Sequence, residues 1–252
     1  MSYAQERQPT FYLGVHRLTG LARFERVMVS VNVLEHDRRE SDFPVRSWIM
    51  DSGAFTRVTS GRGHMALDEY ARWIRRFAEC GDLEAAVSQD YMCEPIALEA
   101  TKWTVAQHQK ETTVRYLALL DRDLPVYLMP VVQGQTPDDY RRHLEQYGRT
   151  LEEGAWVGVG SVCKRNGSPN EVVEILRAIS TDRPDLLWHG FGLKKTALAS
   201  GFVRSMLYSC DSMAWSLAAR KAGRDANSLD EAARYAANLG VQPVQAGMEG
   251  VR

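Results

Sequence analysis

Short apolar segments rich in β-branched residues recur along the whole chain, separated by polar segments and turn-forming residues. Such segments are typical of β-strands. The pattern predicts eight strands, at Phe11–Val15, Val27–Val31, Arg46–Met50, Ala85–Gln89, Val126–Val132, Ala155–Val159, Leu186–Phe191 and Ser205–Cys210.

Between the later strands, the apolar residues follow a helical period instead. Tyr70, Trp73, Ile74 and Phe77 have the spacing of one face of an amphipathic helix. Two other segments begin with a hydroxyl residue followed by proline, which is a typical start of a helix. The predicted helices are Leu67–Cys80, Ile96–Leu120 (with Val114, Leu117 and Leu120 on its apolar face), Thr136–Glu153, Ser168–Ile179, Ser212–Ala222 and Ser228–Leu239.

Strands that alternate with helices predict a mostly parallel sheet, because parallel neighbours need a crossover connection. Eight such units in 252 residues match the usual size of a (β/α)₈ TIM barrel. We therefore expect an α/β barrel, with residues 1–252 as a single domain and a C-terminal helical tail over about 225–252. The alternative is a doubly wound sheet, but Cys163 and Lys195 stand where its GxGxxG fingerprint needs a third glycine.

Polar residues follow the predicted strands at their carboxyl ends, which is where the functional groups of a barrel lie. Each aspartate among them could also serve alone as a helix cap or turn residue. Because several arrive at the same rim, we expect them to form a site. The strand ends carry Asp51, Asp90, Gln133, Asp211 and the glycine-rich bends Gly158–Gly160 and Gly190–Gly192.

Paired carboxylates suit substitution at an anomeric carbon, because one can attack the carbon while the other transfers a proton. A further carboxylate and a carboxamide can bond the edge of a flat heterocycle, and Phe55 can stack on it. Lys194 and Lys195 follow the seventh predicted strand, where barrels often bind phosphate. Otherwise these two lysines begin a solvated helix.

Composition narrows the class of protein. A chain with 44% hydrophobic and 25% charged residues indicates a soluble globular protein. Because it has neither a membrane-length apolar run nor an apolar leader, we expect it in the cytoplasm. The net charge of −1 means that any basic surface for nucleic acid must be local. Its candidates are Arg72, Arg75, Arg76, Arg141 and Arg142, which otherwise form the solvated faces of their helices.

The cysteines and histidines do not have the spacing of a metal site. Cys80, Cys93, Cys163 and Cys210 are far apart in sequence, and no HxxxH or HExxH pair is present. We therefore expect reduced, structural cysteines and no bound metal.

Several of these segments together resemble a known family. DSGAF (51–55), SQD (88–90), VVQG (131–134), GVGS (158–161), HGFG (189–192) and SCDS (209–212) are similar, in this order, to motifs of the tRNA-guanine transglycosylase (queuine tRNA-ribosyltransferase) superfamily. The resemblance covers roughly residues 46–215, and DSGAF and VVQG are its most specific parts. The family has a (β/α)₈ barrel, so the resemblance implies the same fold.

By this resemblance the protein is a pentosyltransferase that replaces guanine in nucleic acid through a covalent bond to C1′. Asp211 would be the nucleophile and Asp51 the general acid and base, with Ser52 beside it. The implied base-binding residues are Phe55, Asp90, Gln133 and the backbone of Gly158, Val159 and Gly160. To these the strand-end pattern adds Gly192 for the substrate, with Lys194 and Lys195 as candidates for the nucleic-acid backbone.

The chain also departs from the family. Ala54 and Thr56 differ from the family motif DSGGFQ, and the CxC…C…H zinc site expected after Asp211 is absent. In the family the zinc subdomain supports tRNA docking. The resemblance therefore shifts towards the short relatives without zinc, which insert 7-deazaguanine bases such as preQ0 into DNA. It implies DNA over tRNA as substrate, no cofactor and, as in the family, a homodimer.

Two other interpretations use the same residues. Water could replace the incoming base, which would make the protein an N-glycosidase of small nucleosides or nucleotides. A barrel without zinc could also be a non-catalytic partner subunit of a transglycosylase. The presence of both Asp51 and Asp211 argues against the second alternative.

Overall fold

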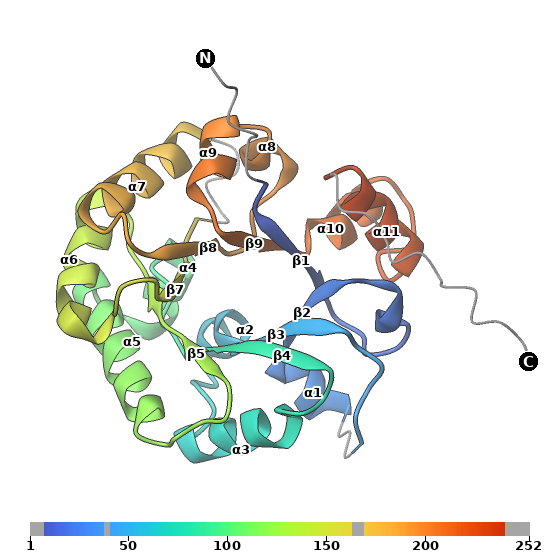
Figure 1. The fold of residues 1–252 in the computed structure, drawn as a ribbon, viewed down its shortest axis with the longest axis horizontal. Coiled ribbons are helices and arrows are strands. Elements are labelled where there is room, and N and C mark those ends of the chain that lie inside the picture. Colours follow the sequence, from blue (N-terminus) through green and yellow to red (C-terminus); the bar gives the residue numbers. More distant parts are fainter. Residues whose placement is uncertain (1–7, 38–40, 163–168, 240–252) are drawn as a thin grey trace, which may run out of the picture.

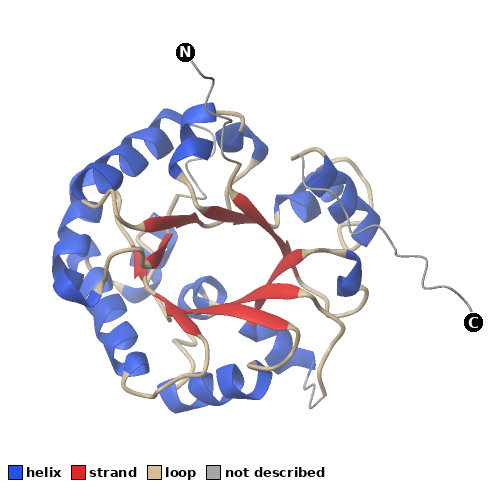
Figure 2. Cartoon of the chain, in the orientation of Figure 1, coloured by secondary structure: helices blue, strands red, loops and turns tan. Residues whose placement is uncertain are grey.

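The computed structural model describes residues 8–37, 41–162 and 169–239, and within them nine parallel strands form a barrel surrounded by helices (Figures 1 and 2). Cys163 and Ser168 lie outside the described residues. The strands are β1 (Thr10–Val15), β2 (Arg26–Ser30), β3 (Ser47–Asp51), β4 (Asp82–Val87), β5 (Tyr127–Met129), β6 (Val131–Val132), β7 (Trp156–Val159), β8 (Leu187–Gly190) and β9 (Ser209–Ser212).

The barrel closes at a strand that proline interrupts. The order of neighbouring strands is β5-β4-β3-β2-β1-β9-β8-β7-β6, and only Pro130 separates β5 from β6 in the chain. Proline has no amide hydrogen for the ladder. The predicted strand Val126–Val132 therefore divides, with β5 paired to β4 and β6 paired to β7. Eight predicted segments thus give nine strands, and the (β/α)₈ barrel fold is confirmed.

Most helices surround this sheet on the outside, whereas the short helix Ala54–Thr59 overlies the ring of strands in the view of Figure 1. In the described ranges, no helix has both the length and the apolar character needed to cross a membrane. The α-helices are α1 (Val31–Asp37), α2 (Ala54–Thr59), α3 (Leu67–Phe77), α4 (Pro95–Thr101), α5 (Val105–Leu120), α6 (Pro137–Tyr147), α7 (Pro169–Asp182), α8 (Lys195–Leu198), α9 (Gly201–Met206), α10 (Ala214–Lys221) and α11 (Leu229–Ala237).

The predicted helix Ile96–Leu120 is two helices, so this prediction was wrong. Lys102 ends α4 with a left-handed backbone (φ 60°). Thr104 then starts α5 with a capping box, in which its hydroxyl accepts from the amide of Gln107 and the Gln107 side chain accepts from the amide of Thr104. Thr104 was a signal in the sequence for the start of a new helix. The long apolar pattern led to the prediction of a single helix instead.

The predicted apolar face of α5 was also wrong, because Val114, Leu117 and Leu120 are exposed. The buried side of this helix is largely polar. Gln109 donates from Nε2 to the carbonyl of Gln133 at 2.7 Å, and further polar side chains of the helix bond other loops of the rim. The helix therefore uses its inner face to hold the loops of the rim.

The last strand begins later than predicted. Ser205 and Met206 belong to α9, which is capped by the Ser200 hydroxyl, so the predicted strand Ser205–Cys210 was wrong at its start. The observed strand β9 contains Asp211 within it. Val31 likewise begins α1 rather than ending β2. Asp211 is consequently paired with Tyr12 of β1 in the parallel ladder and does not lie in a loop.

Two layers of apolar side chains support the site. The larger hydrophobic cluster fills the space between the barrel and its helices. A second cluster fills the barrel interior, as expected from the alternation of side chains along each strand. Its buried members are Tyr12, Met28, Ile49, Ala85, Val87, Met129 and Val131.

The C-terminal helices α10 and α11 lie beside β1 (Figure 1). Trp215 donates from its indole nitrogen to the carbonyl of Gly14 at 2.8 Å, which fixes α10 to the barrel. The predicted helix Ser228–Leu239 is confirmed as α11, with Ser228 as its cap. Residues 240–252 of the expected tail lie outside the described residues.

Candidate active site at the carboxyl ends of the strands

A cavity of about 270 Å³ opens among the carboxyl ends of the strands. Its size is near the lower end of small-molecule sites, about 300–1,000 Å³, and suits a small flat ligand. Seven predicted site residues line it: Asp51, Phe55, Asp90, Gln133, Gly160, Gly192 and Asp211. Five predicted residues do not: Ser52, Gly158, Val159, Lys194 and Lys195.

Asp51 is held by the turn that follows β3. The amide of Gly53 donates to Oδ2 of Asp51 at 3.0 Å, and Asn32 donates to the carbonyl of Gly53 at 3.0 Å. Gly53 has a left-handed backbone (φ 67°), and a Cβ there would lie 2.3 Å from the Asn32 carboxamide. Glycine at this position of the DSGAF motif is therefore required by both backbone and space.

Burial changes the protonation of Asp51. Desolvation, followed by the nearby negative charge of Asp211, raises the pKa of Asp51 to about 6, although amide hydrogen bonds oppose the shift. The carboxyl group can therefore hold or release a proton close to neutral pH. A general acid and base needs this property.

Asp90 faces the cavity from the loop after β4 and accepts a hydrogen bond from Nε2 of Gln133. Desolvation and then the charge of Asp51 raise the pKa of Asp90 to about 7, and Glu94 adds to this shift. A carboxyl group with such a pKa can either accept or donate a hydrogen bond at neutral pH. It is suited to the edge of a heterocycle that carries both donors and acceptors.

The orientation of Gln133 is set by its neighbours. Its backbone amide donates to Nδ1 of His143 at 2.8 Å, and its Oε1 accepts from the Ser161 hydroxyl at 2.6 Å. Oε1 therefore points to Ser161 and Nε2 to Asp90. Gly160 leaves the space for this carboxamide, because a Cβ there would lie 2.0 Å from Nε2.

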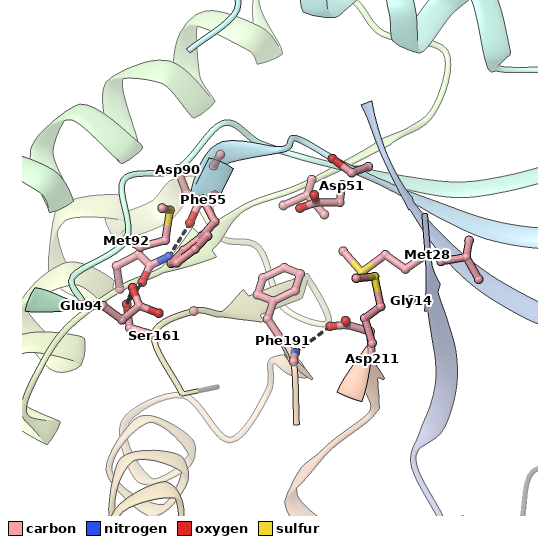
Figure 3. A pocket seen from close by; sticks show the side chains of 18 residues that line it. Gly14, Met28, Asp51, Phe55, Asp90, Met92, Glu94, Ser161, Phe191 and Asp211 are labelled. Carbon is pink, nitrogen blue, oxygen red and sulfur yellow. Dashed lines mark hydrogen bonds between the residues drawn. The ribbon is translucent and has the colours of Figure 1, made fainter. Parts of the chain in front are cut away.

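Asp211 lies on the opposite side of the cavity. Its Oδ1 accepts from the amide of Gly192 at 2.9 Å and lies 3.4 Å from Nε2 of His189. Figure 3 shows Phe191 between Asp211 and the group formed by Asp90, Glu94 and Ser161. The cavity thus has one carboxylate on the Asp211 side and a hydrogen-bonded polar group on the other.

The bend at 158–160 contributes space rather than hydrogen-bond donors. The amide of Gly158 donates to the carbonyl of Pro130 at 2.8 Å, and that of Gly160 donates to Val132 at 2.9 Å. Both amides are therefore part of the barrel ladder. At Gly158 a Cβ would lie 2.3 Å from the ring of Phe191, so this glycine makes room for that ring.

The predicted basic residues lie away from the cavity. The ammonium of Lys195 is 4.7 Å from the centre of the Tyr235 ring, and Lys194 is the N-cap residue of α8. Three of the candidate arginines pair with carboxylates of their own or neighbouring helices and loops: Arg76 with Asp42, Arg141 with Asp138 and Asp182, and Arg142 with Asp139. These ion pairs favour the interpretation in which the arginines belong to the solvated faces of their helices.

Ser52 and the three cysteines in the described part of the chain are not among the residues that line the cavity. The Ser52 side chain is fully buried, and its hydroxyl has no hydrogen-bond partner among the described residues. Cys80, Cys93 and Cys210 are buried and free of disulfides, as predicted for structural cysteines. Within residues 8–37, 41–162 and 169–239, no group of three His, Cys, Asp or Glu side chains could hold a metal ion.

The polar and aromatic side chains at the site that were not predicted from the sequence include Glu94, Ser161, His189 and Phe191. The last three lie within the motifs GVGS and HGFG, whereas Glu94 lies four residues after SQD. His189 directly precedes the bend Gly190–Gly192, and Ser161 directly follows Gly160. Their positions in the motifs were a usable signal, but which of them face the cavity depends on the strand register.

The chain matches the model of a known protein family. A model of the DpdA family, described as DeoxyPurine in DNA protein A, matches residues 7–237. The chain belongs to the DpdA family. The match includes all nine strands of the barrel and every predicted site residue. It agrees with the expected relation to proteins of DNA modification, whereas the wider transglycosylase superfamily remains a prediction. No curated protein matches the chain.

Proposed function

We propose that this member of the DpdA family exchanges guanine in DNA for a 7-deazaguanine base such as preQ0, through a covalent bond between Asp211 and C1′. One observation carries the proposal. Asp51 and Asp211 face the same small cavity, and the Asp90–Gln133 pair lies in it as a group suited to the edge of a purine.

In the first displacement, an ionised oxygen of Asp211 forms a bond to C1′ while the bond from C1′ to guanine breaks. The electron pair of the broken bond stays with the base. Protonated Asp51 gives its proton to the departing guanine, and its pKa of about 6 leaves part of the population protonated near neutral pH.

The second displacement reverses these transfers. The incoming base gives its ring proton to Asp51 and attacks C1′, and the ester bond to Asp211 breaks with its electron pair returning to the carboxylate. Proton and carboxylate are both restored, so the exchange consumes no further reactant. Both bases occupy the same cavity in turn, in agreement with its small volume.

Asp90 and Gln133 would hold the edge of the base, and the half-exposed ring of Phe55 would stack on its face. Three carboxyl groups that line the cavity, those of Asp51, Asp90 and Asp211, would face the bound base and sugar.

DNA as the polymer substrate is supported by the family description, which names deoxypurine in DNA. A base inside a duplex cannot reach a cavity of this kind, so the target nucleotide would be extruded or taken from single-stranded DNA. Binding to the polymer would also weaken as salt increases, since the protein replaces counterions on the phosphates.

The deciding experiment incubates the purified chain with labelled guanine or labelled preQ0 and with duplex DNA, single-stranded DNA or tRNA. Label retained in DNA supports the proposal, and label retained only in tRNA contradicts the choice of polymer. A denaturing gel tests for the covalent adduct, which should be absent in Asp211→Asn. Release of guanine without incorporation identifies an N-glycosidase. Neither adduct nor exchange would favour a non-catalytic subunit.

A further inference from the structure

A chain of hydrogen bonds leads from the barrel interior to the carboxylate of Asp211. Nε1 of Trp156 donates to Oγ of Ser209 at 2.7 Å, and the same oxygen lies 2.8 Å from Nδ1 of His189. Nε2 of His189 lies 3.4 Å from Oδ1 of Asp211. His189 and Ser209 are fully buried, so their polar atoms depend on one another for partners.

The direction of each bond follows from the chemistry of the groups. An indole nitrogen can only donate, so Ser209 Oγ accepts from Trp156. That oxygen could accept a second bond, but the Asp211 carboxylate at Nε2 can only accept, so a neutral imidazole carries its hydrogen at Nε2 and the Ser209 hydroxyl donates to Nδ1. An imidazole that accepts at Nδ1 carries its hydrogen at Nε2. His189 therefore donates to Asp211, which as a carboxylate can only accept.

We infer that His189 is a positioning residue that fixes the attacking carboxylate, with Trp156 and Ser209 setting its tautomer; this rests on the proposed role of Asp211. Oδ1 of Asp211 receives two donors, the Gly192 amide and the His189 ring. Among the described residues Oδ2 has no hydrogen-bond partner, which leaves it as the oxygen for C1′.

The ring of His189 cannot turn freely to change this arrangement. Aromatic rings surround it, with centroid separations of 4.7 Å to Phe191, 6.0 Å to Trp156 and 6.1 Å to Tyr12. Rotation of the ring by half a turn would put Cδ2 in the place of Nδ1 and Cε1 in the place of Nε2, and so break both hydrogen bonds of the imidazole. The packing therefore supports the same orientation as the hydrogen bonds.

This arrangement serves both displacements. Once Oδ2 is bonded to C1′, Oδ1 becomes the carbonyl oxygen of the ester. When the second base attacks, negative charge returns to the carboxylate, and the donors at Oδ1 are already in place to stabilise it. Without His189 the carboxylate could rotate, and either oxygen could then turn towards Gly192.

The tautomer can be tested without any assay of activity. ¹⁵N NMR distinguishes a histidine protonated at Nε2 from one protonated at Nδ1, and the His189 signals are assigned by their loss in His189→Gln. We expect protonation at Nε2 in the wild type and a mixture in Ser209→Ala. Ser88→Ala is the matched control, because the Ser88 hydroxyl is equally buried but has no partner in the described chain. Protonation at Nδ1 in the wild type overturns the inference.

The kinetic consequence is tested with the same variants. By comparison with other groups that orient a reactive ligand, Ser209→Ala and Trp156→Phe should slow formation of the covalent adduct by about 10-fold to 100-fold. The KM for the base should not change. Trp188→Phe is the control for Trp156→Phe, because the buried Trp188 indole nitrogen has no partner among the described residues.

Substitutions of His189 itself distinguish positioning from packing. Gln can place a donor nitrogen close to the position of Nε2, whereas Leu cannot, so His189→Gln should retain more adduct formation than His189→Leu. Equal rates in these two variants, or full rate in Ser209→Ala, overturn the inference. If the wild type forms no adduct but shows the Nε2 tautomer and its loss in Ser209→Ala, the hydrogen-bond assignment stands and the proposed exchange is overturned.

Discussion

Gln133 donates a hydrogen bond to Oδ2 of Asp90, and this bond joins the loops that follow β4 and β6 across the mouth of the barrel. Burial removes water from the Asp90 carboxyl group and so destabilises its ionised form. This desolvation raises the pKa of Asp90 to about 7, although the hydrogen bond from Gln133 acts in the opposite direction. A buried carboxyl group whose ionisation is energetically unfavourable is more typical of a functional site than of a structural contact.

The first prediction concerns stability and pH. The pKa of Asp90 is raised to about 7 in the folded protein, so the folded state binds its proton more tightly than the unfolded state. Stability from this group is fully present below the usual pKa of 3.8 and is lost as pH rises through about 7. Asp90→Asn should therefore be more stable to urea than the wild type at pH 8, by up to about 4 kcal/mol in the free energy of unfolding, and this difference should shrink as the pH is lowered towards 4.

Asp185→Asn provides a control of opposite sign. Its hydrogen bond with Arg183 lowers the pKa of Asp185, so this carboxylate favours folding when ionised. The variant should lose stability at pH 8. A loss of stability in Asp90→Asn at pH 8 would contradict the first prediction.

The space at Gly160 leads to a second prediction. A methyl group there would meet the Gln133 carboxamide, whereas one at Gly158 would meet the ring of Phe191. Gly160→Ala should therefore displace the Asp90–Gln133 pair and weaken binding of guanine, by about 10-fold if one net hydrogen bond of about 1.4 kcal/mol is lost. Calorimetric titration with guanine measures the effect. Gly158→Ala is the comparison, and an equally strong or stronger loss there would assign base binding to Phe191 instead.

Much of the barrel could be predicted from the sequence, because strands buried on both faces are apolar throughout and their spacing was regular. The predicted ends of strands and helices were wrong where a local feature competed with this apolar pattern. Pro130 divided one strand, and the left-handed Lys102 with the Thr104 cap divided one long helix. Ser205 and Met206 seemed to extend an apolar strand, but the Ser200 cap begins a helix that contains them.

The carboxylates at the strand ends could be predicted from the sequence, whereas the residues that orient them could not. Asp51, Asp90 and Asp211 line one cavity, as their positions after the strands suggested. The contribution of His189 could not be predicted, because it depends on Trp156 and Ser209 from two other strands. Contacts between residues so far apart in sequence depend on strand register, which no local motif encodes.

A third prediction concerns the coupling of the two carboxyl groups that we propose as catalytic, Asp51 and Asp211. The charge of Asp211 is one cause of the raised pKa of Asp51, after burial. Asp211→Asn should therefore lower the pKa of Asp51 from about 6 while leaving it above the usual value for aspartate. A ¹³C NMR titration of the Asp51 carboxyl carbon measures this shift. An unchanged titration would mean that the two groups do not share one electrostatic environment.

The fourth prediction separates chemistry from base binding. If Asp211 meets the sugar while Asp90 and Gln133 meet the base, Asp211→Ala should abolish exchange and still bind guanine with nearly wild-type affinity. Asp90→Ala should show the opposite division, with weaker or altered selection of the base. Affinities by calorimetric titration and exchange of labelled guanine distinguish the two variants. Full-rate exchange in Asp211→Ala would remove it from the mechanism.

The last prediction tests stacking at the mouth of the cavity. Phe55 lines the cavity and is 40% exposed, so its side chain contributes little to the core. Stacking of a base on an aromatic ring contributes about 1–3 kcal/mol, so Phe55→Ala should weaken guanine binding by roughly 5-fold to 150-fold. Phe55→Trp should retain most of the affinity.

Phe202→Ala is a matched control, because Phe202 is 41% exposed and lies on α9, outside the cavity lining. Since both truncations remove a ring of similar exposure, equal melting temperatures with a loss of affinity only in Phe55→Ala would assign the effect to stacking. Equal affinities in the two variants would exclude Phe55 from base recognition.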